Sequence, residues 1–228
     1  MKLLIGNKNY SSWSMRPWVM LTQFDIPFEE VMARFDSFAP DSKFKATVAA
    51  LSPAGKVPIL VEDDGFAVWD TLAIAEYVAE KYPDKALWPR DARLRARARS
   101  VCAEMHSGFA ALRGAFGMNI EAALPAVGAR VLAENAAARA DLARMTALWQ
   151  EALAASGGPF LFGEYSIADA YFAPVVMRMR TYALPVPADV AGYIERATAA
   201  KGTAAWIRDA LQEKEFLPFE EDYRTSRD

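Results

Sequence analysis

The sequence is nearly free of cysteine and histidine: Cys102 and His106 are the only residues of these types among 228. A single cysteine excludes an intrachain disulfide and fits a reducing compartment. One cysteine and one histidine do not supply the usual ligand sets of zinc sites unless several carboxylates join them. We therefore expect no metal site, and we expect Cys102 to be a small buried residue.

Long apolar runs and an excess of basic charge are also missing. The N-terminal run Leu3–Ile5 is too short for a secretory signal, and no stretch of about 18 apolar residues occurs. The net charge of −3 and the isoelectric point near 5.4 argue against a nucleic-acid-binding surface. A content of 53% hydrophobic residues suffices for a folded core. Together these features lead us to expect a cytoplasmic protein that binds neither membranes nor nucleic acid.

The first 82 residues mix strand and helix patterns. They predict strands at 2–5, 28–35, 57–61 and 66–69, and helices at 12–24, 44–50 and 71–81. The order is therefore βαβ, then α, then ββα. Asp63-Asp64-Gly65 predicts a hairpin turn between the last two strands.

The composition changes after Tyr82. Residues 83–91 carry prolines and charges and are typical of a linker. From residue 92 to 228 the chain is rich in alanine, and the pattern predicts helices at 92–116, 121–155, 167–182, 188–199 and 204–214. Pro125 and Gly128 are expected to interrupt the start of the second of these. We expect a domain at 1–82, a linker at 83–91 and an all-helical domain at 92–228.

Two short stretches place polar groups where a peptide ligand can bind. A cis bond at Val57-Pro58 would expose the Val57 backbone to an extended peptide, although trans is the commoner form. Asp70-Thr71 precedes an amphipathic helix, and N-capping is the simplest role for such residues. The same helix start can also hold a ligand carboxylate, while Asp70 faces a ligand ammonium.

A third stretch, Ser11-Ser12, lies between the first strand and the first helix. Capping is again the alternative role. A hydroxyl there can instead donate to a thiolate. Lowering a thiol pKa by about two units needs roughly 2.7 kcal/mol, and a hydrogen bond to a charged group contributes about 1.5–3 kcal/mol. A helix start adds about 0.3–1 kcal/mol. One serine and one helix start are therefore enough to lower the thiol pKa by about two units.

These stretches together resemble the cytosolic glutathione S-transferases over the whole chain. The resemblance rests on Ser11-Ser12-Trp13-Ser14-Met15-Arg16, Ser52-Pro53-Ala54-Gly55-Lys56-Val57-Pro58, Asp70-Thr71-Leu72-Ala73-Ile74 and Tyr165-Ser166-Ile167-Ala168-Asp169. It implies a thioredoxin-like α/β domain followed by a helical bundle. Ser166 and Asp169 match a helix capping box, to which we assign a structural role.

The resemblance also implies roles for individual residues. The first motif is similar to the Ser-Ser-Cys-Ser of the zeta class, which makes Ser11 the catalytic serine with Ser12 donating nearby through its N–H or hydroxyl. Val57 would pair with the cysteinyl part of glutathione, and Asp70 and Thr71 would hold its γ-glutamyl end. The full set of expected glutathione-binding residues is Trp13, Lys43, Lys56, Val57, Pro58, Asp70 and Thr71.

The chain departs from the zeta pattern at two places. Trp13 stands where that motif has cysteine, and Ser107–Arg113 lacks the Gln and Asn of the zeta isomerases, which puts maleylacetoacetate isomerisation in doubt. The predicted helix that contains this segment carries residues that recur at helical spacing and are expected to line the electrophile site. Core packing is an equal alternative for the aromatics. The residues expected at this site are His106, Phe109, Arg113 and Phe116.

We therefore expect a glutathione transferase that acts in detoxification, with glutathione as co-substrate and a small apolar electrophile as partner. The family resemblance implies a homodimer. A glutathione-dependent isomerase, peroxidase or dehalogenase on the same fold is an alternative, and so is a non-catalytic ligand-binding protein. The sequence does not identify the natural electrophile.

Overall fold

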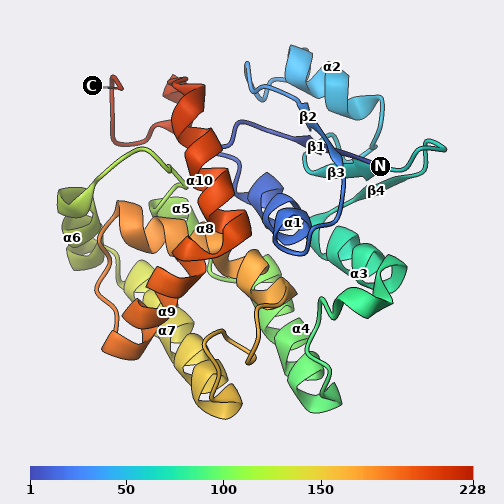
Figure 1. Ribbon diagram of the computed structural model, residues 1–228. Helices are drawn as coiled ribbons and strands as arrows, with labels where there is room; N and C mark the ends of the chain where they lie inside the picture. The colour runs from blue at the N-terminus through green and yellow to red at the C-terminus, as the bar shows by residue number, and fades with distance from the viewer. Residues whose placement is uncertain (228) are drawn as a thin grey trace.

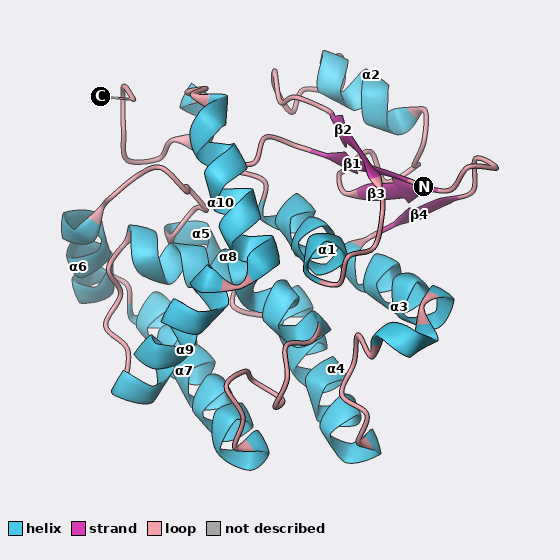
Figure 2. Cartoon of the chain, in the orientation of Figure 1, coloured by secondary structure: helices cyan, strands magenta, loops and turns pink. Residues whose placement is uncertain are grey.

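The computed structural model describes residues 1–227, and a sheet-containing half is followed by a helical half (Figures 1 and 2). The first half contains β1 (Lys2–Ile5), α1 (Ser12–Gln23), β2 (Glu29–Met32), α2 (Lys43–Ala49), β3 (Ile59–Val61), β4 (Ala67–Trp69) and α3 (Thr71–Lys81). The second half contains α4 (Ala92–Ser107), α5 (Ala110–Ala115), α6 (Pro125–Glu134), α7 (Ala136–Ser156), α8 (Ile167–Thr181), α9 (Ala188–Ala199) and α10 (Lys201–Glu213). Short 3₁₀ turns lie at η1 (Pro83–Lys85) and η2 (Pro218–Glu220).

The sheet has the strand order β2-β1-β3-β4, and its two central strands are the buried ones. β1 pairs parallel with β2 and antiparallel with β3, and β3 pairs antiparallel with β4. Alternate side chains of the strands enter two clusters, because successive strand residues point to opposite faces. Leu3, Ile5 and Leu60 pack with α1 and α3, whereas Leu4 and Ile59 pack with α2. Figure 1 shows α2 on one face and α1 and α3 on the other.

The two halves share one core. α1 packs against both α8 and α10, and the larger hydrophobic cluster continues from the sheet into the helical half. Gly202 makes the close approach of α10 possible, because a Cβ there would lie 2.3 Å from the Val19 carbonyl oxygen. The predicted fold class is confirmed, whereas the domain boundaries at residues 82 and 92 stay a prediction.

The elements of the first half were predicted to within two residues, except that the strand predicted at 28–35 is confined to Glu29–Met32. Two long helices of the second half were predicted wrongly. The predicted helix 92–116 is broken after Ser107, where Phe109 adopts a left-handed backbone with φ of 56°. The predicted helix 121–155 is broken at Asn135. Pro125 does not interrupt a helix but begins α6, and Gly128 lies inside α6 with no room for a Cβ beside the Tyr182 carbonyl oxygen.

The capping box predicted at the start of α8 is confirmed. The Asp169 carboxylate accepts from the Ser166 backbone N–H at 2.9 Å, and the Ser166 hydroxyl accepts from the Ala168 N–H at 3.3 Å. Asp169 also accepts from the Leu161 N–H at 3.1 Å. Through these bonds the Asp169 carboxyl group connects the start of α8 to the preceding loop. Burial raises the pKa of Asp169 to about 6.

Asn135 lies at the break between α6 and α7, where it ends the first helix and caps the second. Substituting it tests whether the cap stabilises this break. Its side chain accepts from the Ala138 N–H at 3.0 Å. We expect Asn135→Ala to lower the free energy of unfolding by about 1 kcal/mol, the usual cost of losing an N-cap acceptor. Urea unfolding measures the difference. Asn135→Gly should cost only a few tenths of a kcal/mol, and equal losses for the two variants would contradict the capping role.

Candidate functional site

Ser11 lies in the turn between β1 and α1, where its hydroxyl is held by a second serine. Ser11 occupies the N-cap position of α1, but its side chain makes no capping hydrogen bond. Its Oγ instead donates to Ser14 Oγ at 2.7 Å, and Ser14 Oγ also accepts from the Gly6 N–H at 3.0 Å. Because a hydroxyl both donates and accepts, Ser14 can donate back to Ser11, which frees the Ser11 O–H for a ligand.

The next residues of the chain form the start of α1, and they include a buried arginine whose guanidinium contacts the Ser12 carbonyl oxygen. The Ser12 N–H and hydroxyl were both expected as donors to the ligand. The N–H already donates to the Tyr10 carbonyl oxygen at 2.9 Å, so the hydroxyl is the donor that Ser12 can offer. The Arg16 guanidinium lies 4.2 Å from the centre of the Trp13 ring and donates to the Tyr171 carbonyl oxygen. Burial lowers the pKa of Arg16 to about 10, and no carboxylate among residues 1–227 pairs with it.

The loop before β3 presents Lys56, Val57 and Pro58, and the Val57–Pro58 peptide bond is cis. Lys45 of α2 supports this loop, since its ammonium group donates to the Gly55 carbonyl oxygen at 2.9 Å. Lys43 is exposed at the start of α2 and lines neither of the cavities described below. The structure therefore brings Lys45 to the site in the place where the sequence suggested Lys43.

Asp70 and Thr71 form a closed ring of polar contacts with two residues of the helical half. Asp70 Oδ1 caps α3 by accepting from the Leu72 N–H at 2.9 Å, and Asp70 Oδ2 lies 3.4 Å from His106 Nε2. His106 Nδ1 lies 2.7 Å from the Tyr171 hydroxyl, which lies 2.9 Å from Thr71 Oγ1. Capping is thus confirmed for Asp70, and its second carboxylate oxygen faces His106 at the edge of the cavity described below.

The backbone at Asp70 is strained. Its φ of 74° and ψ of 135° lie in a region that residues with a side chain rarely adopt. Such conformations cost of the order of 1–3 kcal/mol and are concentrated at functional sites. Asp70 therefore combines a capping side chain with a rarely adopted backbone conformation.

Two adjoining cavities collect these residues. The first, which we call the Asp70 cavity, has a volume of about 390 Å³ and is lined by Trp13, Ala54, Lys56, Val57, Pro58, Trp69, Asp70, Thr71 and His106. The second, the Ser11 cavity, has a volume of about 440 Å³ and is lined by Tyr10, Ser11, Ser12, Trp13, Phe35, Phe38, Phe44, Lys45, Lys56, Val57 and Glu220. Both volumes suit a small ligand, and Trp13, Lys56 and Val57 line both cavities. A larger groove of about 660 Å³ beside α5 and α6 is lined by four alanines together with Gly114, Val131, Glu134, Asn135 and Tyr223, and it contains none of the residues that the sequence predicts for the site.

The four residues expected at an electrophile site do not line one common cavity. His106 lines the Asp70 cavity, among the expected glutathione-binding residues. Phe109 and Phe116 are buried in the core and line neither cavity. The Arg113 guanidinium lies 5.6 Å from the centre of the Trp13 ring, and its buried Nε has no hydrogen-bond partner.

Several residues that line the cavities were missed by the sequence analysis. Tyr10, Lys45, Trp69 and Glu220 carry no local motif, and Tyr171 lies 100 positions from its partner Thr71. The aromatic walls Phe35, Phe38 and Phe44 were not assigned to the site either. Only the alternation of the predicted strand 28–35, which ends at Phe35, gave a local hint of a buried ring there.

The described part of the chain has neither a metal-binding cluster nor a membrane-spanning helix. Residues 1–227 contain no group of three or more Cys, His, Asp or Glu side chains arranged to hold a metal ion. Within the same residues, no helix is long and apolar enough to cross a membrane. Cys102 is buried, which raises the pKa of its thiol well above the ordinary value.

Comparison with known proteins agrees with this geometry. The chain is 35% identical over 97 residues to a probable maleylacetoacetate isomerase of Caenorhabditis elegans, a match that spans 42% of each chain. It is 26% identical over 216 residues to the glutathione S-transferase-like protein OpS6 of Beauveria bassiana, covering 93% of this chain and 90% of that one. A crystal structure of a glutathione transferase homolog from Burkholderia GL BGR1 with bound glutathione superposes with a TM-score of 0.69 and 25% identity, covering 92% of this chain and 98% of that one.

Family models locate the same likeness in both halves. The model of the glutathione S-transferase N-terminal domain matches residues 10–81, and that of the C-terminal domain matches residues 96–209. The first range contains Ser11, Val57 and Asp70, and the second contains His106 and Tyr171. The chain therefore belongs to the glutathione S-transferase family.

Proposed function

We propose that this protein is a glutathione transferase in which Ser11 stabilises the thiolate of bound glutathione for attack on an electrophilic carbon. The observation that supports this most is the adjacency of the two cavities. Val57 lines both, with Ser11 on one side and Asp70 and Thr71 on the other. One extended tripeptide can therefore lie along Val57 with its sulfur toward Ser11 and its γ-glutamyl end toward Asp70.

Each part of glutathione then meets a group of suitable chemistry. The γ-glutamyl ammonium faces the Asp70 carboxylate, and the γ-glutamyl carboxylate faces Thr71 and the start of α3. His106 lines the same cavity and is fixed through Nδ1 by Tyr171, so its Nε2 is directed at this end of the ligand. Lys45 and Lys56, which line the Ser11 cavity, are placed to meet the glycyl carboxylate.

The reaction itself needs little covalent chemistry from the protein. The thiolate sulfur forms a bond to the electrophilic carbon, and the leaving group departs with the electrons of the broken bond. The protein holds the sulfur in place and stabilises its charge. The electrophile would enter beside Trp13 and Arg113, against the aromatic walls of the Ser11 cavity. We also propose, from the family resemblance, a cytoplasmic homodimer that acts in detoxification.

Conjugation assays test the proposal directly. Purified protein is incubated with glutathione and one member of a panel that contains a chlorodinitrobenzene, an enone, an epoxide and an alkyl halide. We expect a glutathione conjugate of at least one of them by mass spectrometry. Isomerisation, peroxide reduction or dehalogenation without a conjugate would reassign the chemistry. Binding of glutathione without turnover of any electrophile would favour a ligand-binding protein.

Tyr171 is a positioning residue in this scheme, because its hydroxyl joins His106 to Thr71. Tyr171→Phe removes both hydrogen bonds, and an ordinary hydrogen bond contributes about 1 kcal/mol. We therefore expect the Kd for glutathione to rise about fivefold. Calorimetric titration gives the Kd, and steady-state kinetics should show an unchanged KM for the electrophile.

Tyr223→Phe is the matched control. It removes the hydroxyl that donates to the Ala115 carbonyl oxygen at 2.8 Å, away from both cavities. Its Kd for glutathione should equal that of wild type. Equal weakening by both substitutions, or parallel rises in the two KM values for Tyr171→Phe, would show that Tyr171 acts only on the stability of the fold.

A further inference from the structure

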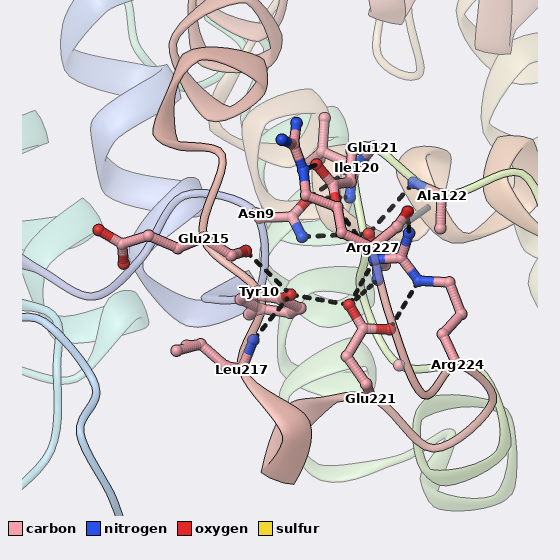
Figure 3. Close-up of polar contacts among 12 residues, drawn as sticks. Asn9, Tyr10, Ile120, Glu121, Ala122, Glu215, Leu217, Glu221, Arg224 and Arg227 are labelled. Atoms are coloured by element: carbon pink, nitrogen blue, oxygen red, sulfur yellow. Dashed lines mark hydrogen bonds and ion pairs between the residues drawn. The ribbon is translucent and has the colours of Figure 1, made fainter.

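The segment after α10 is fastened to the residue that precedes Ser11 (Figure 3). The Tyr10 hydroxyl donates to Glu221 Oε1 at 2.7 Å and accepts from the Leu217 N–H at 3.3 Å. Glu221 is held in turn by Asn119 Nδ2 at 2.9 Å and by Arg224. Leu217 and Glu221 flank the η2 turn, so both ends of this turn are fixed against Tyr10.

This arrangement brings Glu220, the last residue of η2, into the Ser11 cavity. Glu220 lines the cavity together with Ser11 and Ser12, and the neighbouring Phe219 ring packs edge-on against Phe38 at 5.3 Å. Within residues 1–227 the Glu220 carboxylate has no hydrogen-bond or ion-pair partner. Half-buried and unpaired, it is free to interact with a molecule in the cavity.

The environment of Glu220 favours proton exchange near neutral pH. Burial raises its pKa to about 7, and the neighbouring carboxylates of Asp222 and Glu221 act in the same direction. Because the pKa of this acid is raised, the carboxylate form becomes the major one only above about pH 7. Its ability to accept a proton should therefore increase as the pH rises through 7.

No other group that lines the Ser11 cavity can take this role. Lysine ammonium groups donate but cannot accept, which excludes Lys45 and Lys56. Burial and the hydrogen bond to Glu221 raise the pKa of Tyr10 to about 12, so its hydroxyl keeps its proton. His106 and Asp70 line the neighbouring cavity, where they face one another and Tyr171.

We propose that Glu220 accepts the thiol proton of glutathione bound in the Ser11 cavity, an inference that rests on the function proposed above. The S–H bond breaks and its electron pair stays on sulfur, while the proton forms an O–H bond with the Glu220 carboxylate. Ser11 then donates its O–H to the thiolate. The transfer itself leaves the net charge of the cavity unchanged. The charge becomes one unit more negative when Glu220 releases the proton to solvent through its exposed side.

Stopped-flow absorbance of the thiolate band tests this step. Wild type and Glu220→Gln are mixed with glutathione at several pH values around 7. We expect Glu220→Gln to form thiolate at least tenfold more slowly, because a positioned acid or base contributes about 10²–10⁴-fold to rate. Added imidazole should restore part of the rate, and Glu220→Asp should retain part of it. The Kd for glutathione should stay within about twofold, since Glu220 forms no part of the peptide-binding contacts.

Glu164→Gln is the matched control, because it makes the same change at an exposed carboxylate that lines neither cavity. Its rate of thiolate formation should match wild type. A Glu220→Gln rate within twofold of wild type, or a slow rate that imidazole does not restore, would overturn the role of Glu220 and leave the role of Ser11 standing. A wild-type complex that shows no thiolate band at any pH would overturn both, so the two failures are distinguishable.

Discussion

Ser11→Ala is expected to raise the pKa of the bound glutathione thiol by about two units while leaving the peptide bound. A hydrogen bond to a charged group contributes about 1.5–3 kcal/mol, and each pKa unit corresponds to about 1.4 kcal/mol. At a pH below both pKa values, the thiolate fraction and kcat/KM should fall up to roughly a hundredfold. Above the raised pKa, the rates of variant and wild type should converge. Ultraviolet titration of the complex gives the thiol pKa, and kcat/KM against pH gives the kinetic consequence.

The Kd of the same variant separates its role in catalysis from a role in binding. Ser11 contacts only the sulfur in the proposed pose, so the Kd for glutathione should stay within about threefold of wild type. Ser12→Ala is the matched control, since Ser12 is the neighbouring hydroxyl in the Ser11 cavity. A pH profile for Ser11→Ala that superimposes on wild type, or a larger loss for Ser12→Ala, would contradict the assignment.

The magnitudes also decide which group dominates the charge stabilisation. The start of α1 adds about 0.3–1 kcal/mol, which is less than one charged hydrogen bond. Arg16 adds positive charge, but its guanidinium is directed at backbone oxygens of Tyr171 and Ser12. The hydroxyl is therefore expected to account for most of the shift, and the helix start and Arg16 for the remainder.

The sheet half was predictable because its signals are local. Hydrophobic strands, an Asp-Gly turn and the cap at Asp70 each depend on residues that are adjacent in the chain. The breaks at Phe109 and Asn135 were missed because alanine-rich sequence favours helix on both sides of them. At the first break, a Cβ at Gly108 would lie 2.7 Å from the carbonyl oxygen of Glu104 in the same helix, so this helix end requires glycine.

The site was predictable where motifs placed it and not where tertiary packing did. Trp13, Lys56, Val57, Asp70 and Thr71 line one cavity as expected, because each lies close to the start of α1, β3 or α3. Positions 43 and 45 are about 200° apart around a helix, so only one lysine can face the cavity. Sequence alone did not fix the rotation of a helix of seven residues, and it chose Lys43.

No local sequence pattern indicated that Glu220 lines the Ser11 cavity. Glu220 reaches the Ser11 cavity because Tyr10 binds Leu217 and Glu221, more than 200 positions away. A single exposed-looking glutamate near a chain end is ordinarily a solvated surface residue. Contacts of this separation follow from the packing of α10 against α1, which no short pattern encodes.

Asp70→Asn is expected to weaken glutathione binding roughly 10- to 100-fold. The carboxylate is placed to bind the γ-glutamyl ammonium, and a charge-assisted hydrogen bond contributes about 1.5–3 kcal/mol. Asparagine keeps an oxygen for the Leu72 N–H and tolerates the positive φ of this position. The substitution therefore removes the charge without removing the cap, and calorimetric titration measures the Kd.

The ligand supplies the second half of this test. Glutathione acetylated on its γ-glutamyl nitrogen has no ammonium, so it should bind wild type as weakly as glutathione binds Asp70→Asn, and the variant should not distinguish the two ligands. Asp91→Asn is the matched control, because Asp91 caps α4 through the Arg93 and Leu94 N–H groups and lines neither cavity. If Asp70→Asn binds glutathione as wild type does, or still prefers it over the acetylated form by the wild-type factor, the ammonium must be recognised elsewhere, and the proposed direction of the peptide along Val57 is wrong.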